Sequence, residues 1–354
     1  MRPASFHIFV SPVLRHINVE VFDYLCCMGR NEPVVSVLMP AYNHGKYIRQ
    51  AIESFLDQQE IDARLYIGDD ASTDNTLSIA REYADKFPDK ITIFAHQRNL
   101  GLMGNYKFLI ENSASTYIAI LESDDYWTYP LKLHKQVEYM ESHPGCGLVY
   151  TSCEFVQEQG KQLGIKCVKD KLYISGSNSG ERLVDKVMWK NPVVAVTACF
   201  RRSAFDASCI LDDFIKEDFV TFDYPVWLGL ASCSDFYSLS DITAAYRVMG
   251  SSVSNSANYA KREHFMSGID RIVEYSVDRF SYGGDIVALR NERVVKHMML
   301  ALAFSEFERY SYFCKQIYPW AGLKWAVIRY IPWIFRFKKR KIIGTRALDK
   351  LAVL

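Results

Sequence analysis

Short apolar runs alternate with amphipathic segments along the middle of this chain. From residue 34 the runs have the length and β-branched content of buried strands, and apolar residues recur at helical spacing between them. This alternation predicts an α/β fold, a mostly parallel central sheet with flanking helices wound through β-α-β units. The expected strands are Val34–Met39, ended by Pro40, then Leu65–Ile67, Ile91–Ala95, Tyr117–Leu121 and Gly147–Thr151. The expected helices are Tyr47–Gln58, a segment opened by Ser72–Asp74, Met103–Glu111 and Pro130–Met140.

The pattern changes in the second half of the chain. Residues 155–185 are polar and rich in Gly and Ser, which indicates an exposed, mobile stretch. Strand character returns at Val193–Phe200 and Asp235–Leu239, with a helix at Tyr224–Ala231 between them. Beyond Lys261 the periodicity is helical. The sheet is therefore expected to end near residue 250, and a helical C-terminal extension to follow.

Composition narrows the class of protein. The 354 residues are 49% apolar and 23% charged, with a formal net charge of +1, which excludes a disordered chain, collagen and a coiled coil. The charge is unevenly distributed, because residues 320–354 hold nine Lys and Arg against the single acid Asp349. The body of the chain is mildly acidic and the tail strongly basic.

The cysteines and the N-terminus indicate a compartment. There are nine cysteines, with no C-x-x-C pair and no Cys/His cluster of zinc-ligand spacing, so we expect reduced thiols and a cytoplasmic protein. The apolar run at Ile8–Val10 is too short for a secretory signal, and no span reaches the length of a bilayer without charge.

The residues that follow four of the expected strands carry polar chemistry. In open parallel sheets, ligands bind outside the carboxyl ends of the strands. An aromatic face beside a carboxylate can stack on a base and accept its N–H, and adjacent carboxylates can hold a hard divalent cation together with phosphate and water. The four loops are Pro40–Asn43, Gly68–Asp74, Arg98–Gly101 and Glu122–Trp127. Three of them supply groups suited to a nucleotide or a metal.

Each acidic loop also has a simpler interpretation. Asp69 and Asp70 could form a solvated turn ahead of a helix capped by Asp74, and residues 122–125 could form a polar turn. Three acids packed directly after an apolar strand would repel one another, so a bound cation explains them better than a bare turn.

Taken together, these segments resemble an inverting family-two glycosyltransferase with the GT-A fold. The motifs that carry the resemblance are Val35–Asn43, Asp69–Thr76, Asn99–Gly101 and Leu121–Trp127. It covers roughly residues 33–255, which divide into a nucleotide-binding half, 33–151, and an acceptor half, 152–255. An N-terminal extension, 1–32, and a helical region with a basic aromatic tail, 256–354, lie on either side.

The resemblance implies a donor site for a nucleoside diphosphate sugar, most often a UDP-sugar. Ala41 and Tyr42 would border the base, Asp70 would accept its N3–H, and Asp124 would be the ligand of Mg²⁺ or Mn²⁺. Glu122 departs from the usual first Asp of the D-x-D motif, although its longer carboxylate can still reach the ribose or metal-bound water. The residues expected to bind the donor are Pro40, Ala41, Tyr42, Asn43, Asp70, Arg98, Asn99, Gly101, Glu122, Ser123 and Asp125.

An inverting enzyme also needs a general base for the acceptor hydroxyl. Phe222–Leu228 resembles the family's E-D-Y-x-x-W-L segment, which makes Asp223 the expected base. Asp223 could instead cap a helix ahead of Tyr224-Pro225, and Glu217-Asp218 is a competing candidate. Further on, Ala245–Ser254 resembles a Y-R-x-H segment whose His can ligate the metal, but Met249 stands there, and a thioether is a poor ligand for Mg²⁺ or Mn²⁺.

The function expected from the resemblance is transfer of a sugar to a glycan or lipid-linked acceptor in surface polysaccharide assembly. A sugar-nucleotide nucleotidyltransferase is a rival, but residues 40–45 are not the Gly-rich, basic triphosphate loop that it would need. A second rival is a binding protein that has lost activity, for which Met249 and Glu122 are the warning signs.

The tail suggests where the protein works. Aromatic residues in Trp320–Phe335 precede the basic cluster Arg336–Lys341, a combination that suits an anionic membrane surface. A core-packing helix with a solvated charged end is an equal alternative. A nucleic-acid site is disfavoured, since the body is acidic and the other motifs already account for a nucleotide. We expect a cytoplasmic protein, peripheral on the inner face of the plasma membrane through 320–341.

Overall fold

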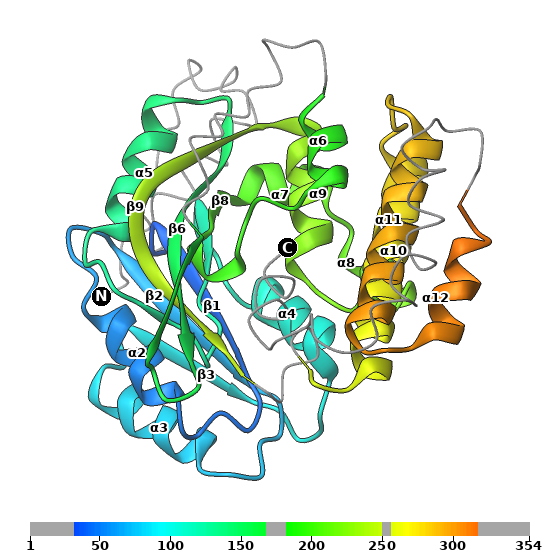
Figure 1. Ribbon diagram of the computed structural model, residues 1–354. Coiled ribbons are helices and arrows are strands. Elements are labelled where there is room, and N and C mark those ends of the chain that lie inside the picture. Colours follow the sequence, from blue (N-terminus) through cyan, green and yellow to red (C-terminus); the bar gives the residue numbers. More distant parts are fainter. Residues whose placement is uncertain (1–31, 168–181, 250–255, 318–354) are drawn as a thin grey trace, which may run out of the picture.

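The computed structural model describes residues 32–167, 182–249 and 256–317 of the chain. In these ranges the strands form one nine-stranded mixed sheet with helices on both faces, as Figure 1 shows. The sheet order is β3 (Ile91–Ala95), β2 (Ala63–Asp69), β1 (Val35–Ala41), β4 (Tyr117–Ile120), β8 (Cys199–Arg201), β6 (Cys146–Gln157), β9 (Asp235–Val248) and β5 (Tyr126–Trp127), with β7 (Gln162–Cys167) paired to β6. The α/β fold is confirmed.

The parallel part of the sheet is the part best marked in the sequence. Strands β3, β2, β1 and β4 all run in the same direction, whereas β8, β5 and β7 pair antiparallel with their neighbours. In β1, Val37 and Met39 pack into the core on one face and Leu38 into the core on the other. A strand buried on both faces has a continuous apolar sequence, which explains why the sequence pattern predicts β1.

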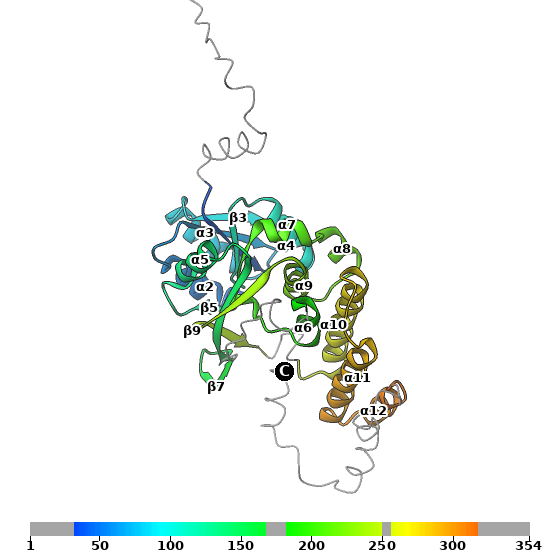
Figure 2. The same cartoon turned by 90° about the horizontal axis from the view of Figure 1, so that it is seen from above.

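Two helical layers cover the sheet. One face carries α2 (Ile48–Leu56), α3 (Thr76–Lys86) and α5 (Lys132–Ser142). The other carries α4 (Gly101–Glu111), α6 (Leu183–Trp189), α7 (Arg202–Ser208), α8 (Leu211–Lys216) and α9 (Asp223–Cys233). The helical extension is confirmed as α10 (Tyr259–Arg279), α11 (Ile286–Ala303) and α12 (Phe307–Cys314), and α10 packs against α9. Figure 2 shows these three helices beside the sheet domain, with the β6–β7 hairpin protruding from it.

Two expected strand boundaries are wrong. Pro40 does not end β1, because the pairing continues through Pro40 opposite Gly68 and Ala41 opposite Asp69. The ladder with β4 stops at Leu38, so Pro40 lies where β1 needs no N–H on that side.

The expected strand Val193–Phe200 is also wrong in its first part, which is a loop with the short 3₁₀ helix η2 (Ala195–Thr197). Side chains replace strand partners here: Trp127 Nε1 donates to the Val196 carbonyl at 2.9 Å, and Gln136 Nε2 donates to the Thr197 carbonyl at 2.9 Å. Only Cys199–Arg201 joins the sheet.

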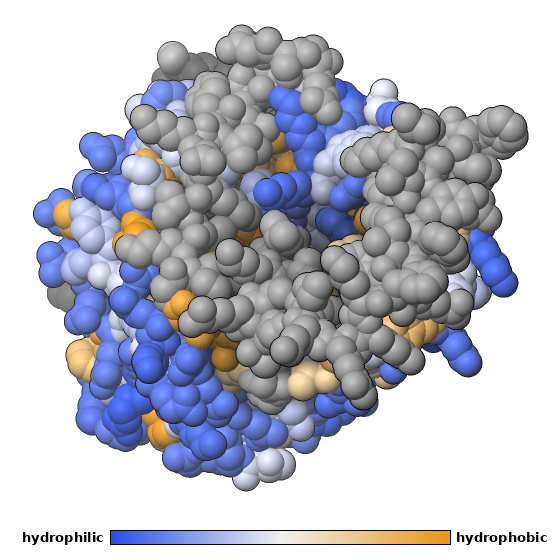
Figure 3. Space-filling view, in the orientation of Figure 1, coloured by the Kyte–Doolittle hydropathy of each residue, from blue (hydrophilic) through white to orange (hydrophobic). Residues whose placement is uncertain are grey.

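Other expectations fall outside or at the edge of the described residues. The N-terminal extension up to residue 31, residues 168–181 of the Gly/Ser-rich stretch and the tail at 320–341 are not described. Among the described cysteines, Cys146, Cys199, Cys209 and Cys233 are free thiols. Within the described ranges, no helix combines the length and the apolar character needed to cross a membrane. On the face drawn in Figure 3, the described surface is mainly hydrophilic, with small apolar patches.

Candidate functional site

The carboxyl ends of three adjacent strands bring the predicted loops together. β2, β1 and β4 are neighbours in the sheet and run parallel, so the loops that follow them leave the same edge. The Asp70 amide donates to the Ala41 carbonyl at 2.9 Å, which joins the first two loops. The sheet topology therefore builds the candidate site from segments as far apart in sequence as Pro40 and Ser123, which are separated by 83 residues.

The loop after β1 is held by the loop after β2. Asn43 has a positive φ of 56°, its amide donates to the Ser72 hydroxyl at 3.0 Å, and its Oδ1 accepts the Thr73 amide at 2.8 Å. Asp74 was expected to cap the next helix, but the N-cap of α3 is Asn75; Asp74 lies one residue earlier, and its carboxylate accepts the amides of both Gly45 and Thr76 at 2.9 Å. These bonds leave Tyr42 47% exposed at the loop surface, as a stacking face requires.

Asp70 is buried, and the loop after β3 is built on it. Its Oδ1 accepts the Leu100 amide at 2.6 Å, and its carbonyl accepts Asn99 Nδ2 at 3.1 Å. Gly101 has a positive φ of 74° and open space around it, with its amide donating to Asn99 Oδ1 at 2.9 Å. Arg98 is exposed on the same loop. Asp70 Oδ2 has no described protein donor, so the carboxylate retains an acceptor.

The loop after β4 is fastened to β1 by a fully buried serine. Ser123 Oγ donates to the Pro40 carbonyl at 2.9 Å, and His44 Nδ1 lies 2.8 Å from Ser123 Oγ. A hydroxyl has one proton, so His44 must donate its Nδ1–H to Ser123, which fixes its neutral tautomer with the lone pair on Nε2. Ser123 therefore serves the loop's structure, and its hydroxyl is already committed.

The three acids of this loop have different surroundings. Asp125 is buried; its Oδ1 accepts the Arg247 amide at 2.7 Å, and its Oδ2 has no hydrogen-bond partner among the described residues. Asp124 has a side chain 20% exposed and lies 4.0 Å from His44 Nδ1. Among the described residues, we find no hydrogen bond to the Asp124 carboxylate. Asp124 is thus the acid best placed to meet a ligand.

Asp223 shares the electrostatic environment of this loop. Burial, followed by the charges of Asp124 and Asp223, raises the pKa of Glu122 to about 8. Burial, followed by the charges of Asp124 and Glu122, raises the pKa of Asp125 well above its ordinary value. The charge of Asp223, at the start of α9, therefore acts on the acidic loop, Glu122–Trp127.

Asp223 is the first residue of α9, where the Thr221 hydroxyl donates to its carboxylate. Burial raises the pKa of Asp223, and the hydrogen bonds from Thr221 and neighbouring groups oppose that rise. The rivals Glu217 and Asp218 are exposed after α8, and Arg271 Nη2 donates to the Asp218 carbonyl at 3.1 Å. Neither rival is among the charges that raise the pKa of Glu122, and both are exposed, so Asp223 is the better candidate.

The described residues contain no group of three or more His, Cys, Asp or Glu side chains arranged to hold a metal ion. Mg²⁺ usually takes one or two carboxylates and completes its sphere with substrate phosphates and water. The partly exposed Asp124 carboxylate, without a described hydrogen-bond donor, fits a cation shared with a phosphate ligand in this way. Met249, at the position where the resemblance expects His, is buried.

Sequence reasoning missed several residues that shape the site. His44 and Arg247 hold the acidic loop, and Tyr106 of α4 stacks on Phe222 beside Asp223 at 3.9 Å between ring centroids. The charges of Glu122 and Asp223 act on the buried Tyr106 hydroxyl. The sequence did mark Arg247, since it stands in the segment that resembles Y-R-x-H, whereas nothing in the sequence marks Tyr106, which lies in an ordinary amphipathic helix.

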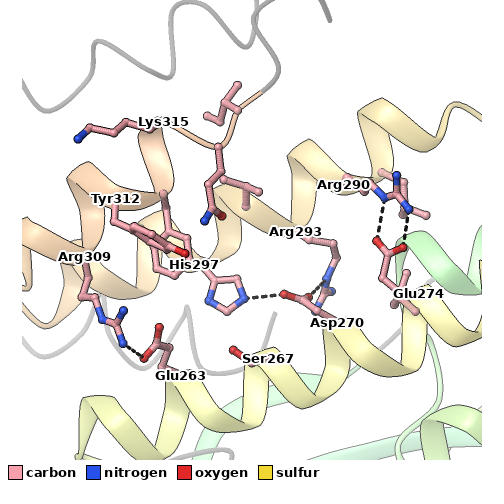
Figure 4. A pocket seen from close by; sticks show the side chains of 16 residues that line it. Glu263, Ser267, Asp270, Glu274, Arg290, Arg293, His297, Arg309, Tyr312 and Lys315 are labelled. Atoms are coloured by element: carbon pink, nitrogen blue, oxygen red, sulfur yellow. Dashed lines mark hydrogen bonds and ion pairs between the residues drawn. The ribbon is translucent and has the colours of Figure 1, made fainter. Parts of the chain in front are cut away.

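A cavity of about 780 Å³ lies elsewhere, among α10, α11 and α12 (Figure 4). Its carboxylates are paired: Asp270 contacts Arg293 at 2.5 Å and His297 at 2.6 Å, and Arg290 contacts Glu274 at 2.6 Å. None of the residues predicted from the sequence to bind donor or metal lines it. These groups serve the contact between helices.

Comparison with known proteins supports the family. The family model described as glycosyl transferase family 2 matches residues 36–207. An uncharacterised protein of Mycobacterium bovis is 30% identical over 232 residues, which are 65% of this chain and 63% of that protein. The putative teichuronic acid biosynthesis glycosyltransferase TuaG of Bacillus subtilis is 27% identical over 258 residues, 69% of this chain and 95% of TuaG. The chain therefore spans about 63% of the length of the mycobacterial relatives.

Solved structures share the fold. TarS of S. aureus, residues 1–349 in complex with UDP-GlcNAc, aligns with a TM-score of 0.55 at 15% identity, covering 80% of this chain and 81% of TarS. The mannosyltransferase PcManGT of Pyrobaculum calidifontis, in complex with GDP-Man and Mn²⁺, aligns with a TM-score of 0.53 at 15% identity, covering 95% and 91%. At this identity the likeness shows the GT-A fold alone. Residues 36–207 of this chain match glycosyl transferase family 2.

Proposed function

We propose that this protein is an inverting glycosyltransferase that moves a sugar from a nucleoside diphosphate sugar to a hydroxyl of a glycan or lipid-linked acceptor. The observation that carries the proposal is the partly exposed Asp124 carboxylate in the loop after β4, at the carboxyl edge of three parallel strands, together with Asp223 at the start of α9, whose charge acts on Glu122. One carboxylate is suited to the leaving group's cation and the other to the acceptor's proton. The matched family, and TuaG as a putative glycosyltransferase, agree with this.

The donor would lie along the carboxyl ends of β1, β2 and β4. The exposed Tyr42 ring supplies a stacking face, and Ala41 lines the base beside it. Asp70 keeps one carboxylate oxygen for a base N–H, a donor that uracil carries at N3 and guanine at N1. TarS is solved with UDP-GlcNAc and PcManGT with GDP-Man, so the choice of UDP rests on the resemblance to a family that most often uses UDP-sugars.

Asp124 would hold Mg²⁺ or Mn²⁺ together with the donor's phosphates. A cation there supplies a Lewis acid for the negative charge that develops on the leaving diphosphate. Asp125, fixed by the Arg247 amide, keeps its second oxygen for the donor sugar or its phosphates. Arg98, Asn99 and Gly101 form the opposite border of the donor site in this proposal.

Asp223 would accept the proton of the acceptor hydroxyl as that oxygen attacks the anomeric carbon from the side opposite the diphosphate. The bond to the diphosphate breaks as the new glycosidic bond forms, so the configuration inverts. The Thr221 hydroxyl orients the carboxylate, and burial makes it a stronger base than an exposed Asp.

A donor panel tests the proposal. Each nucleoside diphosphate sugar is added with Mn²⁺, and both thermal stability and donor hydrolysis are measured, since a ligand that binds the native state raises the melting temperature. We expect one UDP-sugar to stabilise the protein and to be consumed only with metal. Nucleoside triphosphate consumption would instead support a nucleotidyltransferase, and donor binding without turnover would support an inactive binding protein.

The basic, aromatic tail supports a proposal for where in the cell the protein works. Residues 320–341 would attach the protein to the anionic inner face of the plasma membrane, where lipid-linked acceptors of surface polysaccharides are available. Removing residues 336–354 should release the protein from vesicles of 30% anionic lipid, because each basic residue removed contributes roughly 1 kcal/mol to the free energy of membrane binding. Activity on a soluble acceptor should remain. Vesicle binding that survives the deletion, or that ignores salt, would favour a core-packing helix.

A further inference from the structure

Arg247 lies near the end of β9 and is only 5% exposed. A buried guanidinium is costly unless its N–H groups find acceptors. Each of its nitrogen atoms donates to a protein oxygen: Nε to the Asp124 carbonyl at 2.7 Å, Nη1 to the Glu158 carbonyl at 2.7 Å, and Nη2 to Gln50 Oε1 at 2.9 Å. The side chain is therefore held in one position.

Two tyrosine rings fix the guanidinium further. It lies 4.9 Å from the ring centre of Tyr47 and 5.5 Å from that of Tyr126. The Tyr47 hydroxyl in turn donates to Glu158 Oε1 at 2.7 Å. Arg247 thus joins four segments: β9, the start of α2, the acidic loop and the turn between β6 and β7. Figure 2 shows that this turn belongs to the hairpin that protrudes from the sheet.

The contacts of Arg247 with the acidic loop are made through the main chain. Nε holds the carbonyl of Asp124, and the Arg247 amide holds the carboxylate of Asp125 at 2.7 Å. No described donor holds the Asp124 carboxylate itself, so the direction in which that carboxylate points is set by its backbone. The backbone of Asp124 is set by Ser123 on one side and by Arg247 on the other.

We propose that Arg247 is a positioning residue: it fixes the backbone of Asp124 and Asp125 for a cation and the donor's phosphates, and links that loop to the β6–β7 turn of the acceptor half. The nature of the ligand rests on the proposed function, but the ordering of the loop by Arg247 does not. A shift of the β6–β7 turn would reach Asp124 through a single side chain.

The chain offers a matched control in Arg201. Its Nε donates to the Cys146 carbonyl at 3.0 Å, its Nη1 donates to the Tyr117 hydroxyl at 3.0 Å, and its guanidinium lies 5.3 Å from the Tyr117 ring centre. Arg201 pairs with Tyr117 at the amino end of β4, opposite to the end that carries the acidic loop. Lysine keeps the charge in either position, but it lacks the guanidinium nitrogens that donate to separate acceptors.

The test compares Arg247→Lys with Arg201→Lys in the full-length protein. Amide hydrogen exchange of the segment 121–129 is measured without ligand, and Mn²⁺ binding is measured by electron paramagnetic resonance in the presence of UDP. In Arg247→Lys we expect exchange in this segment to be at least about threefold faster, and Mn²⁺ binding about tenfold weaker. Arg201→Lys should change neither, although it lowers the melting temperature.

Gln50→Ala keeps the proposal testable if Arg247→Lys does not fold. It removes a single acceptor of Arg247, so a smaller increase in exchange confined to 121–129 is expected. Wild-type exchange in this segment for both Arg247→Lys and Gln50→Ala, or equal effects in Arg201→Lys, would overturn the proposal. A wild-type protein that binds neither UDP nor Mn²⁺ would refute the proposed function, and the exchange rates would still decide the role of Arg247.

Discussion

Asp223 and Asp124 are both aspartates, yet their surroundings give them different chemistry. Asp223 accepts the Thr221 hydroxyl, and burial raises its pKa, which suits a group that must take up a proton. Asp124 is partly exposed with no described hydrogen bond to its carboxylate, which suits a group that meets a cation. Residue type alone cannot distinguish these roles.

Asp223→Asn should lower kcat by roughly 10²–10⁴-fold while UDP and Mn²⁺ still bind, because an amide of the same shape cannot accept the acceptor's proton. Steady-state kinetics at saturating donor and direct UDP binding measure the two effects. In the wild type, kcat should fall as the pH drops through the raised pKa of Asp223, since only the ionised carboxylate is a base.

Asp218→Asn is the control for this variant, since Asp218 is exposed five residues earlier. It should turn over normally. If Asp218→Asn is inactive and Asp223→Asn is active, then Asp223 serves only the start of α9.

Asp70→Asn separates base recognition from loop structure. The amide oxygen can still accept the Leu100 N–H that Asp70 Oδ1 accepts, but the NH₂ group cannot accept the N3–H of uracil. UDP affinity should fall about tenfold, and kcat at saturating donor should change little, because a base contact is the same in ground and transition states. Titration calorimetry with UDP measures this, and wild-type affinity would place the base elsewhere.

Among the secondary-structure elements, the local hydrophobic pattern was enough to predict those whose buried positions recur regularly along the chain. β1 to β4 and the helices between them were predictable because each strand is an apolar run and each helix has one apolar face. The short helices α6, α7 and α8 were missed, and they have only six or seven residues each. β8 was overextended because Trp127 and Gln136, about 60 to 70 residues away, satisfy the loop's carbonyls.

The candidate site divides in the same way. Asp70, Asp124 and Asp223 stand in local motifs, so the sequence was able to nominate them. Arg247 and His44 act through contacts 123 and 79 residues away, which no local pattern reveals. The tie of Ser123 to Pro40 likewise depends on the pairing of β1 with β4.

The ion pairs of Asp270 between α10 and α11 should make the stability of this helix contact depend on pH. Burial opposes ionisation of Asp270, but the His297 hydrogen bond and the Arg293 charge outweigh it and lower its pKa. A lowered pKa means that the stabilisation is present above the pKa of the unfolded chain and is lost as the pH falls through the folded value. Asp270→Asn should therefore cost about 1–3 kcal/mol at pH 7 and much less near pH 2.

Urea unfolding of wild type and Asp270→Asn at both pH values measures this difference. Glu274→Gln is the control, because the Glu274–Arg290 pair is about half exposed and should contribute little. An equal loss for both variants, or a loss for Asp270→Asn that does not depend on pH, would contradict the account.

Over the whole molecule, the site is shared between the matched segment and the chain beyond it. The acidic loop lies within residues 36–207, whereas Asp223 and Arg247 lie after them. α9, which begins with Asp223, packs between the sheet and α10. The C-terminal helices therefore support the element that carries the proposed base, even though they hold no predicted donor residue.

The most direct test of the proposed activity is donor turnover by the wild type and by Asp124→Ala, with and without Mn²⁺. The wild type should release the nucleoside diphosphate only with metal. Asp124→Ala should lose this turnover while keeping its fold, since the change removes the ligand and relieves repulsion with Glu122. Turnover that does not need metal, or normal metal-dependent turnover by Asp124→Ala, would contradict the account.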